Sequence, residues 1–384
     1  MPYKQTVQHY HQQQQQQQPP QNPQYPQQTF APQPPSSIPR LNYGVAAAFV
    51  GKDQAWHATR SIFHFNPYHR IQPTKKPASQ RPPSGHDAFF ITPVGDTGSI
   101  AVGVADGVGG WVDSGVDPAD FSHAFCDYMA MAAFGYPGPE LITPKTLMQK
   151  GYDAVCNDKA ISAGGSTAVV GVAQPNGSVE IANLGDSGYI HLRLGAVHAF
   201  SEAQQHGFNT PYQLSVVPPS MAARMATYGG AHLSDLPRNA DVSRHEMRSG
   251  DVLVFASDGV WDNMFNEDIL KIVSKMMMAS GAWFAGPDGA MAVSPSIGEL
   301  TKLPEPREGQ ILDSRSTLQS LVASRIALTA KSNSVEKRRD SPFAQAVRRA
   351  RKGQQWLGGK VDDIMVVVLI ASQDGSMTAV KPRL

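Results

Sequence analysis

Three aspartates stand where apolar, strand-like runs begin or end, and this placement suits metal chemistry. Asp106 and Asp258 each follow such a run and precede a glycine, and Asp362 comes just before the run 364–370. A single Asp-Gly step is typical of a turn, but its recurrence on separate strands favours a shared site. None of the three runs contains a Lys or Arg, so a bound cation is the simplest compensation for carboxylates at the edge of a dry core. Oxygen ligands favour Mg²⁺ or Mn²⁺ over Zn²⁺.

The elements that must position these acids are short strands and helices that arrive in pairs. The strands are apolar on both faces, which predicts two packed sheets covered by helices on the outside. Asp117 followed by Pro118 is a helix start, and Thr143 followed by Pro144 is another. We expect strands at 99–105, 166–173, 179–184, 189–194, 252–256 and 364–370, and helices after Asp117, at 144–161, 263–279, 316–331 and 342–352.

Composition divides the chain into three parts. Residues 1–42 are rich in Gln and Pro and are expected to be disordered, because they offer little apolar surface to bury. Residues 43–83 are basic with one acid, which fits either a mitochondrial targeting segment or a flexible linker. One globular domain is expected at 84–384, with an irregular surface insertion at 281–310.

The overall charge and the cysteines exclude several classes of protein. With 33 basic and 32 acidic side chains the formal charge is +1, so we expect no nucleic-acid partner. No apolar run approaches the ~18 residues that a membrane span requires. Two cysteines, Cys126 and Cys156, are too few for a thiolate metal site or a disulfide scaffold, and we expect both to be small buried residues. Neither is surrounded by the glycines and Arg of a cysteine phosphatase motif. The oligomeric state stays open.

Five motifs occur in an order that resembles the metal-dependent (PPM, type 2C) protein serine/threonine phosphatases. The resemblance covers residues 84–372 and implies an α+β fold, a four-layer α-β-β-α sandwich of two mostly antiparallel sheets flanked by helix pairs. It also implies hydrolysis of phosphoserine and phosphothreonine in protein substrates by a metal-activated water at a binuclear Mn²⁺ or Mg²⁺ centre. The motifs are GVADGVGG (103–110), GSTA (165–168), ANLGDSG (182–188), ASDGVWDN (256–263) and GKVDDI (359–364).

The resemblance assigns roles residue by residue. By match of motif, Asp106 would bridge both metal ions and take part in catalysis, and the Gly107 carbonyl would bind one of them. Asp258 and Asp362 would bind the other ion.

Other positions match the family less completely. Asp186 and Asp262 correspond to acids that hold a weaker third metal ion in some members. Family members usually carry two consecutive acids where this chain has His86 and Asp87, so either His86 is a metal ligand or Asp87 does this work. Arg81 is a weak candidate for the arginine that binds phosphate, since it equally fits a basic linker.

Two further segments resemble the mitochondrial branch of the family, which is linked to coenzyme Q synthesis. They are EAQQHGFNTPYQL (202–214) and SPFAQ (341–345). The resemblance therefore favours the mitochondrion, and within it the matrix, over the cytoplasm. An alternative function is a catalytically weak pseudophosphatase that binds a phosphoprotein or another partner, which the departure at His86 motivates.

Overall fold

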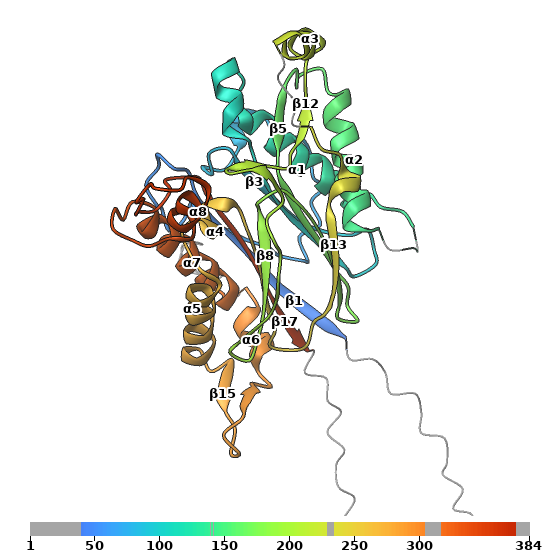
Figure 1. The fold of residues 1–384 in the computed structure, drawn as a ribbon. Coiled ribbons are helices and arrows are strands. Elements are labelled where there is room, and N and C mark those ends of the chain that lie inside the picture. The colour runs from blue at the N-terminus through green and yellow to red at the C-terminus, as the bar shows by residue number, and fades with distance from the viewer. Residues whose placement is uncertain (1–39, 139, 141, 229–233, 304–315, 374–384) are drawn as a thin grey trace, which may run out of the picture. The chain divides into compact units, whose positions relative to one another are not determined.

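The computed structural model describes residues 40–138, 140, 142–228, 234–303 and 316–373, which belong to one compact unit. Two large antiparallel sheets form its centre (Figure 1). The first sheet has the order β2 (Ile62–His64), β1 (Leu41–Val50), β17 (Ile364–Gln373), β14 (Val252–Ala256), β8 (Gly188–Arg193) and β9 (Ala196–Phe200). The second has the order β13 (Asp241–Glu246), β7 (Ser178–Leu184), β6 (Ala168–Ala173), β4 (Ile100–Asp106) and β3 (Asp87–Pro93).

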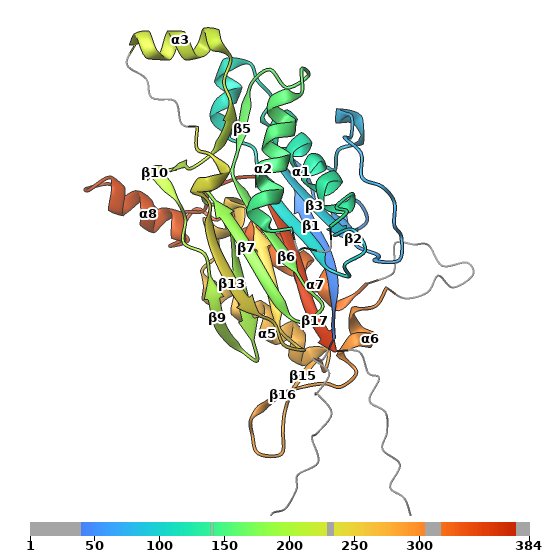
Figure 2. The same cartoon turned by 90° about the vertical axis from the view of Figure 1, so that its right-hand side faces the viewer.

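Paired helices cover the outer face of each sheet (Figure 2). Helices α1 (Pro118–Phe134) and α2 (Pro144–Asn157) pack on the five-stranded sheet, and α5 (Asn266–Ala279) and α7 (Leu318–Ser334) pack on the six-stranded sheet. The expected four-layer α-β-β-α sandwich is therefore confirmed. The smaller elements are α3 (Pro219–Tyr228), α4 (Asp258–Trp261), α6 (Ile297–Thr301), α8 (Pro342–Ala350), η1 (Ala78–Gln80), η2 (Gly109–Ser114), η3 (Pro237–Asn239), β5 (Gly164–Ser166), β10 (Gln205–Gly207), β11 (Thr210–Pro211), β12 (Leu214–Val216), β15 (Trp283–Ala285) and β16 (Met291–Val293).

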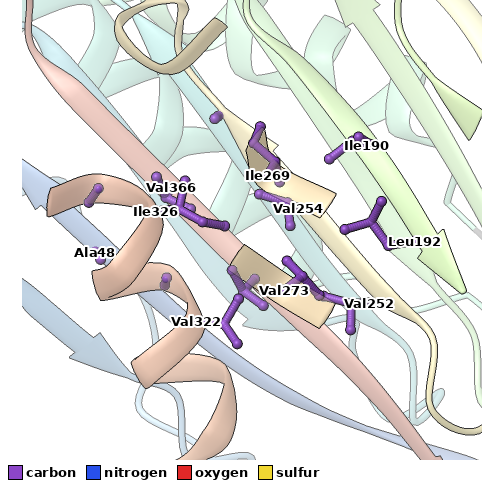
Figure 3. Packing of buried hydrophobic residues seen from close by; sticks show 14 of the residues in the cluster. Ala48, Ile190, Leu192, Val252, Val254, Ile269, Val273, Val322, Ile326 and Val366 are labelled. Atoms are coloured by element: carbon purple, nitrogen blue, oxygen red, sulfur yellow. The ribbon is translucent and has the colours of Figure 1, made fainter. Parts of the chain in front are cut away.

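Strand β14 shows why the central strands are apolar on both faces. Its Val252 and Val254 point into the layer beneath α5 and α7, where Val273 and Ile326 meet the sheet (Figure 3). Phe255, one residue on, belongs instead to the layer between the two sheets. Complete burial of each such side chain contributes roughly 1.5–3 kcal/mol. Because successive side chains of a strand point to opposite faces of the sheet, β14 contributes to both hydrophobic layers.

The boundary expected at Ser84 is wrong, because β1 is an inner strand of the six-stranded sheet, between β2 and β17. Its residues pair with β17 from Leu41 opposite Gln373 to Val50 opposite Ile364. Side chains from Val45 to Val50 are buried. The segment 43–83 is therefore part of the fold rather than a linker that precedes it. Of the tract 1–42, which was expected to be disordered, all but the last three residues lie outside the described residues.

The insertion at 281–310 is more ordered than expected. It forms the β15–β16 hairpin and α6, and residues 304–310 lie outside the described part of the chain. Trp283 is 1% exposed and donates from Nε1 to the Gly250 carbonyl at 2.9 Å, and Ile297 is equally buried. Both side chains extend the core beneath α5 and α7.

Two smaller expectations can also be compared with the structure. Cys126 is buried as expected, but Cys156 is exposed. No helix among the described residues is long and apolar enough to cross a membrane.

Candidate metal centre

The registers of the two sheets bring the ends of several strands together at one end of the sandwich. Asp87 at the start of β3 lies opposite Asp106 at the end of β4. In the other sheet Ala256 is paired with both Gly188 and Val366. The aspartates that flank these three residues along the chain are Asp186, Asp258 and Asp362. Antiparallel pairing therefore gathers acids that are far apart in the sequence.

The hydroxyl group of Ser257 joins the two sheets at this end. Ser257 Oγ, at the end of β14, donates to Asp87 Oδ2 at 2.6 Å, and it accepts from the Met365 backbone N–H at 3.1 Å. Ser257 is fully buried and Asp87 is 1% exposed. The hydroxyl thus fixes one carboxylate oxygen of the five-stranded sheet against two strands of the six-stranded sheet.

Asp87 and Asp106 carry charge that the protein does not neutralise. Burial raises the pKa of Asp106 well above its ordinary value, and the negative charges of Asp258 and Asp87 add to the shift. Burial likewise raises the pKa of Asp87, with a further contribution from Asp363, although the Ser257 hydrogen bond opposes it. The ion pairs found among the described residues include none to Asp87 or Asp106. A divalent cation would oppose both shifts, because its positive charge favours the ionised carboxylates.

Lys360 supplies a positive charge to the other side of the cluster. Its Nζ lies 2.5 Å from Asp258 Oδ2, 2.8 Å from Asp262 Oδ2 and 3.0 Å from Asp362 Oδ2. Burial alone would lower the pKa of Lys360, but the three carboxylates outweigh burial and raise it. A lysine just outside the apolar runs therefore offsets part of the charge of Asp258 and Asp362, a contribution that the sequence expectation of a bound ion did not include.

The two remaining acids also have perturbed pKa values. Burial raises the pKa of Asp186 to about 7, with the charges of Asp258 and Asp262 adding to it, and Gln205 Nε2 donates to Asp186 Oδ2 at 3.0 Å. Burial also raises the pKa of Asp262 to about 7, although Lys360 opposes the shift. Burial raises the pKa of Asp362 as well, and Asp258 adds to it.

The donor set fits a hard cation, although the carboxylates are not closed around one. As the side chains stand, no three His, Cys, Asp or Glu residues in the described ranges are grouped so that they could hold a metal ion. The uncompensated pair Asp87 and Asp106 nevertheless offers only oxygen atoms, the ligands that Mg²⁺ and Mn²⁺ prefer. At Gly107 a Cβ would lie 2.8 Å from the Pro118 carbonyl oxygen and 2.9 Å from that of His86, so only glycine fits beside Asp106.

His86 lies in a turn that Asp363 holds in place. Asp363 Oδ2 accepts from the His86 backbone N–H at 2.7 Å, and Oδ1 accepts from the Lys52 backbone N–H at 2.7 Å. The His86 ring Nδ1 lies 3.8 Å from Asp363 Oδ2. Gly85 has φ +68° and a Cβ there would lie 2.1 Å from the Asp363 carboxylate. Asp363 therefore ties the entry to β3 and the end of β1 to the start of β17.

Comparison with known proteins agrees with this geometry. The chain is 31% identical over 295 residues to "Protein phosphatase 2C homolog 7, mitochondrial" of Saccharomyces cerevisiae, covering 76% of this chain and 75% of the yeast protein. The chain belongs to the protein phosphatase 2C family. It is also 30% identical to the "5-azacytidine resistance protein azr1" of Schizosaccharomyces pombe, covering 87% of this chain and 97% of that one. As a member of this family it is a metal-dependent protein phosphatase.

Other comparisons of this type 2C phosphatase bear on coverage and on the fold. "Probable protein phosphatase 2C 80" of Arabidopsis thaliana is 32% identical over 74% of this chain, which spans only 54% of the plant protein. The "photosystem II phosphatase PBCP" has the same fold, with a TM-score of 0.55 and 22% identity over 86% of this chain and 98% of that one. No protein-family model matches the sequence.

The acid cluster contains most of the residues that the sequence singled out. Asp87, Asp106, Asp258 and Asp362 influence one another's charges, and Asp186 and Asp262 adjoin them. Arg81 is different: its Nη2 lies 2.7 Å from Asp120 Oδ1 in the first turn of α1, and its side chain is 12% exposed. The ion pair with Asp120 therefore accounts for the position of the Arg81 side chain.

Sequence reasoning missed three functional or supporting residues of the phosphatase site: Ser257, Lys360 and Asp363. Ser257 and Asp363 each adjoin a chosen aspartate, but their partners lie more than a hundred residues away along the chain. Lys360 precedes Asp362 by two residues, and only the folded turn shows that its ammonium reaches Asp258 and Asp262. The presence of this lysine within the last motif, GKVDDI, was the available signal.

A cavity of about 280 Å³ opens beside the acid cluster of the phosphatase. Its lining includes Asp186 at one end and the side chains of Phe200, Trp261 and Phe265. The indole of Trp261 is held by a hydrogen bond of 2.9 Å from Nε1 to the Ala256 carbonyl. The cluster therefore borders a space that is partly apolar and large enough for an amino-acid side chain.

Proposed function

We propose that this phosphatase hydrolyses phosphoserine and phosphothreonine in proteins with a water molecule activated by two divalent cations, Mn²⁺ or Mg²⁺. The observation that carries the proposal is the pair Asp87 and Asp106, buried at the meeting point of the two sheets with no cationic partner among the described residues. Such a pair is costly to ionise unless a cation accompanies it. A purely structural acid pair would not need to be kept there.

The proposed ligands come from both sheets. Asp106 would bridge the two ions, the Gly107 carbonyl would bind one ion, and Asp258 and Asp362 would bind the other. Asp87, with or without His86, would complete the coordination of the ion that the Gly107 carbonyl binds. When bound, such ions lower the pKa of water towards neutrality and offset charge on the phosphoryl oxygens.

The surrounding side chains would hold these carboxylates in position before substrate arrives. Ser257 orients Asp87 through its hydrogen bond of 2.6 Å, and the Ser166 hydroxyl donates to the Asp106 carbonyl at 2.8 Å. The Thr167 backbone N–H also donates to the Asp106 carbonyl, at 3.0 Å. These contacts fix the backbone of β4 where its carboxylate leaves the sheet, which limits reorganisation during the reaction.

Arg81 stays a weaker proposal for the phosphate-binding residue. Its guanidinium would have to leave Asp120, or share itself between Asp120 and phosphate, to reach a substrate. The neighbouring helix α1 begins beside Gly107, which supports proximity to the site.

We propose a mitochondrial location, in the matrix. The printed name of the yeast relative supports the mitochondrion. Because β1 is a central strand, a processed form that is active should retain Leu41 and everything after it. Recovery of the protein from purified mitochondria would check the location, and sequencing its N-terminus would check that β1 is retained. A terminus after Val50 in an active protein would contradict the retention of β1.

A pseudophosphatase is the second candidate, and Lys360 is the observation that favours it. An ammonium within 3.0 Å of Asp258, Asp262 and Asp362 could neutralise part of the cluster without metal. It does not reach Asp87 and Asp106 as an ion pair, which is why the metal-dependent enzyme is preferred.

The test is turnover of a phosphothreonine peptide by the full chain, with Mn²⁺ or Mg²⁺ and after chelation with EDTA. We expect metal-dependent release of phosphate, and a loss of at least ~100-fold in Asp106→Asn, because even the outer partners of metal ligands are worth 10–100-fold. Asp241→Asn, an exposed aspartate on the edge strand β13, is the matched control and should retain activity. Absence of metal-dependent turnover in the unmutated protein would leave the pseudophosphatase as the better account.

A further inference from the structure

The backbone around Lys360 is fixed so that its side chain is presented to the acid cluster. The buried Asn263 donates from Nδ2 to the Lys360 carbonyl at 2.8 Å and accepts the Lys360 backbone N–H on Oδ1 at 2.9 Å. At Gly359 a Cβ would lie 2.2 Å from the Asn333 carbonyl oxygen, so the chain approaches α7 too closely for any other residue. The lysine is therefore positioned by its surroundings and is not a mobile surface side chain.

The ammonium of Lys360 is saturated by carboxylates. It has three N–H donors, and three carboxylate oxygens lie within 3.0 Å of Nζ, from Asp258, Asp262 and Asp362. The Phe343 ring centroid lies 5.6 Å from Nζ, at a distance suited to a cation–π contact. The side chain is 18% exposed, so water screens these interactions only in part.

The acids around the ammonium identify which ion it would exclude. By match of motif, Asp186 and Asp262 are the positions that hold a weaker third metal ion in some relatives. Lys360 pairs with Asp262 at 2.8 Å. Of the residues assigned to the principal ions, Asp87 and Asp106 form no ion pair with Lys360 among the described contacts, whereas Asp258 and Asp362 pair with it through one carboxylate oxygen each.

Charge also bears on a third ion. Seven carboxylates gather here, from Asp87, Asp106, Asp186, Asp258, Asp262, Asp362 and Asp363. Two divalent ions and one ammonium offset five of their seven negative charges. A third divalent ion beside the ammonium would have to approach a positive charge in a partly buried site, where the repulsion is strong.

We propose that the Lys360 ammonium takes the place of the third metal ion, so that this phosphatase binds two divalent cations and uses a built-in cation between Asp258 and Asp262. Lys360 is thus a positioning residue that holds these carboxylates apart from a third ion. The inference rests on the proposed binuclear function. It predicts that Asp262 forms an ion pair with Lys360 and does not bind a metal ion.

The experiment counts bound Mn²⁺ on the full chain by equilibrium dialysis with electron paramagnetic resonance of the free ion, a readout that does not depend on turnover. We expect two Mn²⁺ per wild-type chain and a third, weaker Mn²⁺ in Lys360→Met. Lys360→Met combined with Asp262→Asn should return to two, and Lys360→Arg, which keeps the charge, should stay at two.

Lys331→Met is the matched control. Lys331 is a partly buried lysine whose Nζ donates to the backbone carbonyls of Gly51 and Lys52, and it forms no ion pair among the described contacts. Its replacement should leave the Mn²⁺ count at two. Circular dichroism of each metal-free variant confirms folding, and Lys360→Gln is the substitute should Lys360→Met fail to fold.

Two results would overturn the inference. One is a third Mn²⁺ on the wild-type chain. The other is a Lys360→Met protein that still binds two Mn²⁺ but binds one of them more tightly, because the lysine would then compete with a principal ion. The proposed function fails separately: a wild-type chain with two Mn²⁺ and no turnover would refute hydrolysis and leave the role of Lys360 intact.

Discussion

His86 is the residue at which this phosphatase departs from the usual pair of consecutive acids. Its backbone N–H is fixed by Asp363 and its ring lies 3.8 Å from that carboxylate, so the side chain sits at the edge of the cluster. We expect His86→Glu to maintain or raise phosphatase activity and to tighten Mn²⁺ binding, since a carboxylate is a better ligand for a hard ion than imidazole. Titration of activity against Mn²⁺ concentration measures both effects. A large loss of turnover would show that the imidazole has a dedicated role.

Asp251 provides a test of pH dependence away from the metal centre. It is 1% exposed, and burial would raise its pKa, but hydrogen bonds from Arg193 at 2.6 and 2.8 Å and from His191 outweigh burial and lower the pKa. A carboxylate with a lowered folded-state pKa stabilises the fold above its unfolded pKa of about 3.9, and this contribution is lost as the pH falls through the folded-state pKa.

We therefore expect Asp251→Asn to lower the free energy of unfolding near neutral pH by roughly 3–5 kcal/mol, as for a broken buried ion pair. The difference from wild type should shrink as the pH falls below about 4. Urea denaturation of both proteins at several pH values measures it. A difference that stays constant down to pH values well below the ordinary aspartate range would mean that the Asp251 charge does not stabilise the fold.

The residue scale also shows how far the sequence could predict the site. Asp106, Asp258 and Asp362 were predictable because each adjoins a recognisable strand, so a local pattern carries the information. Ser257 and Lys360 were not, because their contacts depend on which strands become neighbours and on the path of one turn. A hydroxyl or an ammonium has no sequence periodicity that reveals its partner.

At the scale of elements, the turn that leads into β3 depends on one glycine. Gly85 has φ +68° and lies against the Asp363 carboxylate, where a Cβ would be 2.1 Å away. Gly195, in the tight turn between β8 and β9, has φ +79° but no atom within 4 Å of its Cβ position. Comparing alanine substitutions at Gly85 and Gly195 therefore separates the cost of a left-handed backbone from the cost of a steric clash.

We expect Gly195→Ala to cost roughly 1–2 kcal/mol, the penalty for an ordinary residue in the left-handed region. Gly85→Ala should cost more and should also weaken Mn²⁺ binding, because the Asp363 carboxylate must move and the His86 turn moves with it. Thermal melting with and without Mn²⁺ gives both quantities. Equal losses in the two variants, with unchanged Mn²⁺ affinity, would show that the turn accommodates the methyl group.

Most elements were predictable, and the exceptions have physical causes. The strands that precede or follow the motifs are long apolar runs, and Asp117 and Thr143 do cap α1 and α2 as their sequences suggest. Strand β1 was missed because its apolar run stands between a Gln/Pro-rich tract and a basic, aromatic segment. Only its pairing with β17, more than three hundred residues later, makes it a core element.

At the scale of the whole molecule, this pairing sets the minimum folding unit. We expect the chain from Arg40 onward to fold and to retain activity, and the chain from Ser84 onward to fail, because the latter lacks β1 and exposes one edge of β17. Circular dichroism and phosphatase assay of both truncated proteins provide the measurement. A stable, active protein that begins at Ser84 would show that β1 is dispensable.

The register of β1 with β17 has a practical consequence for attaching anything to this phosphatase. Leu41 and Gln373 face each other at one end of the pair, and Val50 and Ile364 face each other at the end that carries the acids (Figure 2). Ten strand residues separate the two ends, a span of roughly 30 Å at about 3.3 Å per residue. A fluorescent label or affinity handle attached next to Leu41 or Gln373 would therefore lie at the end of this strand pair opposite the acid cluster. Protein immobilised in this way should stay accessible to large phosphoproteins.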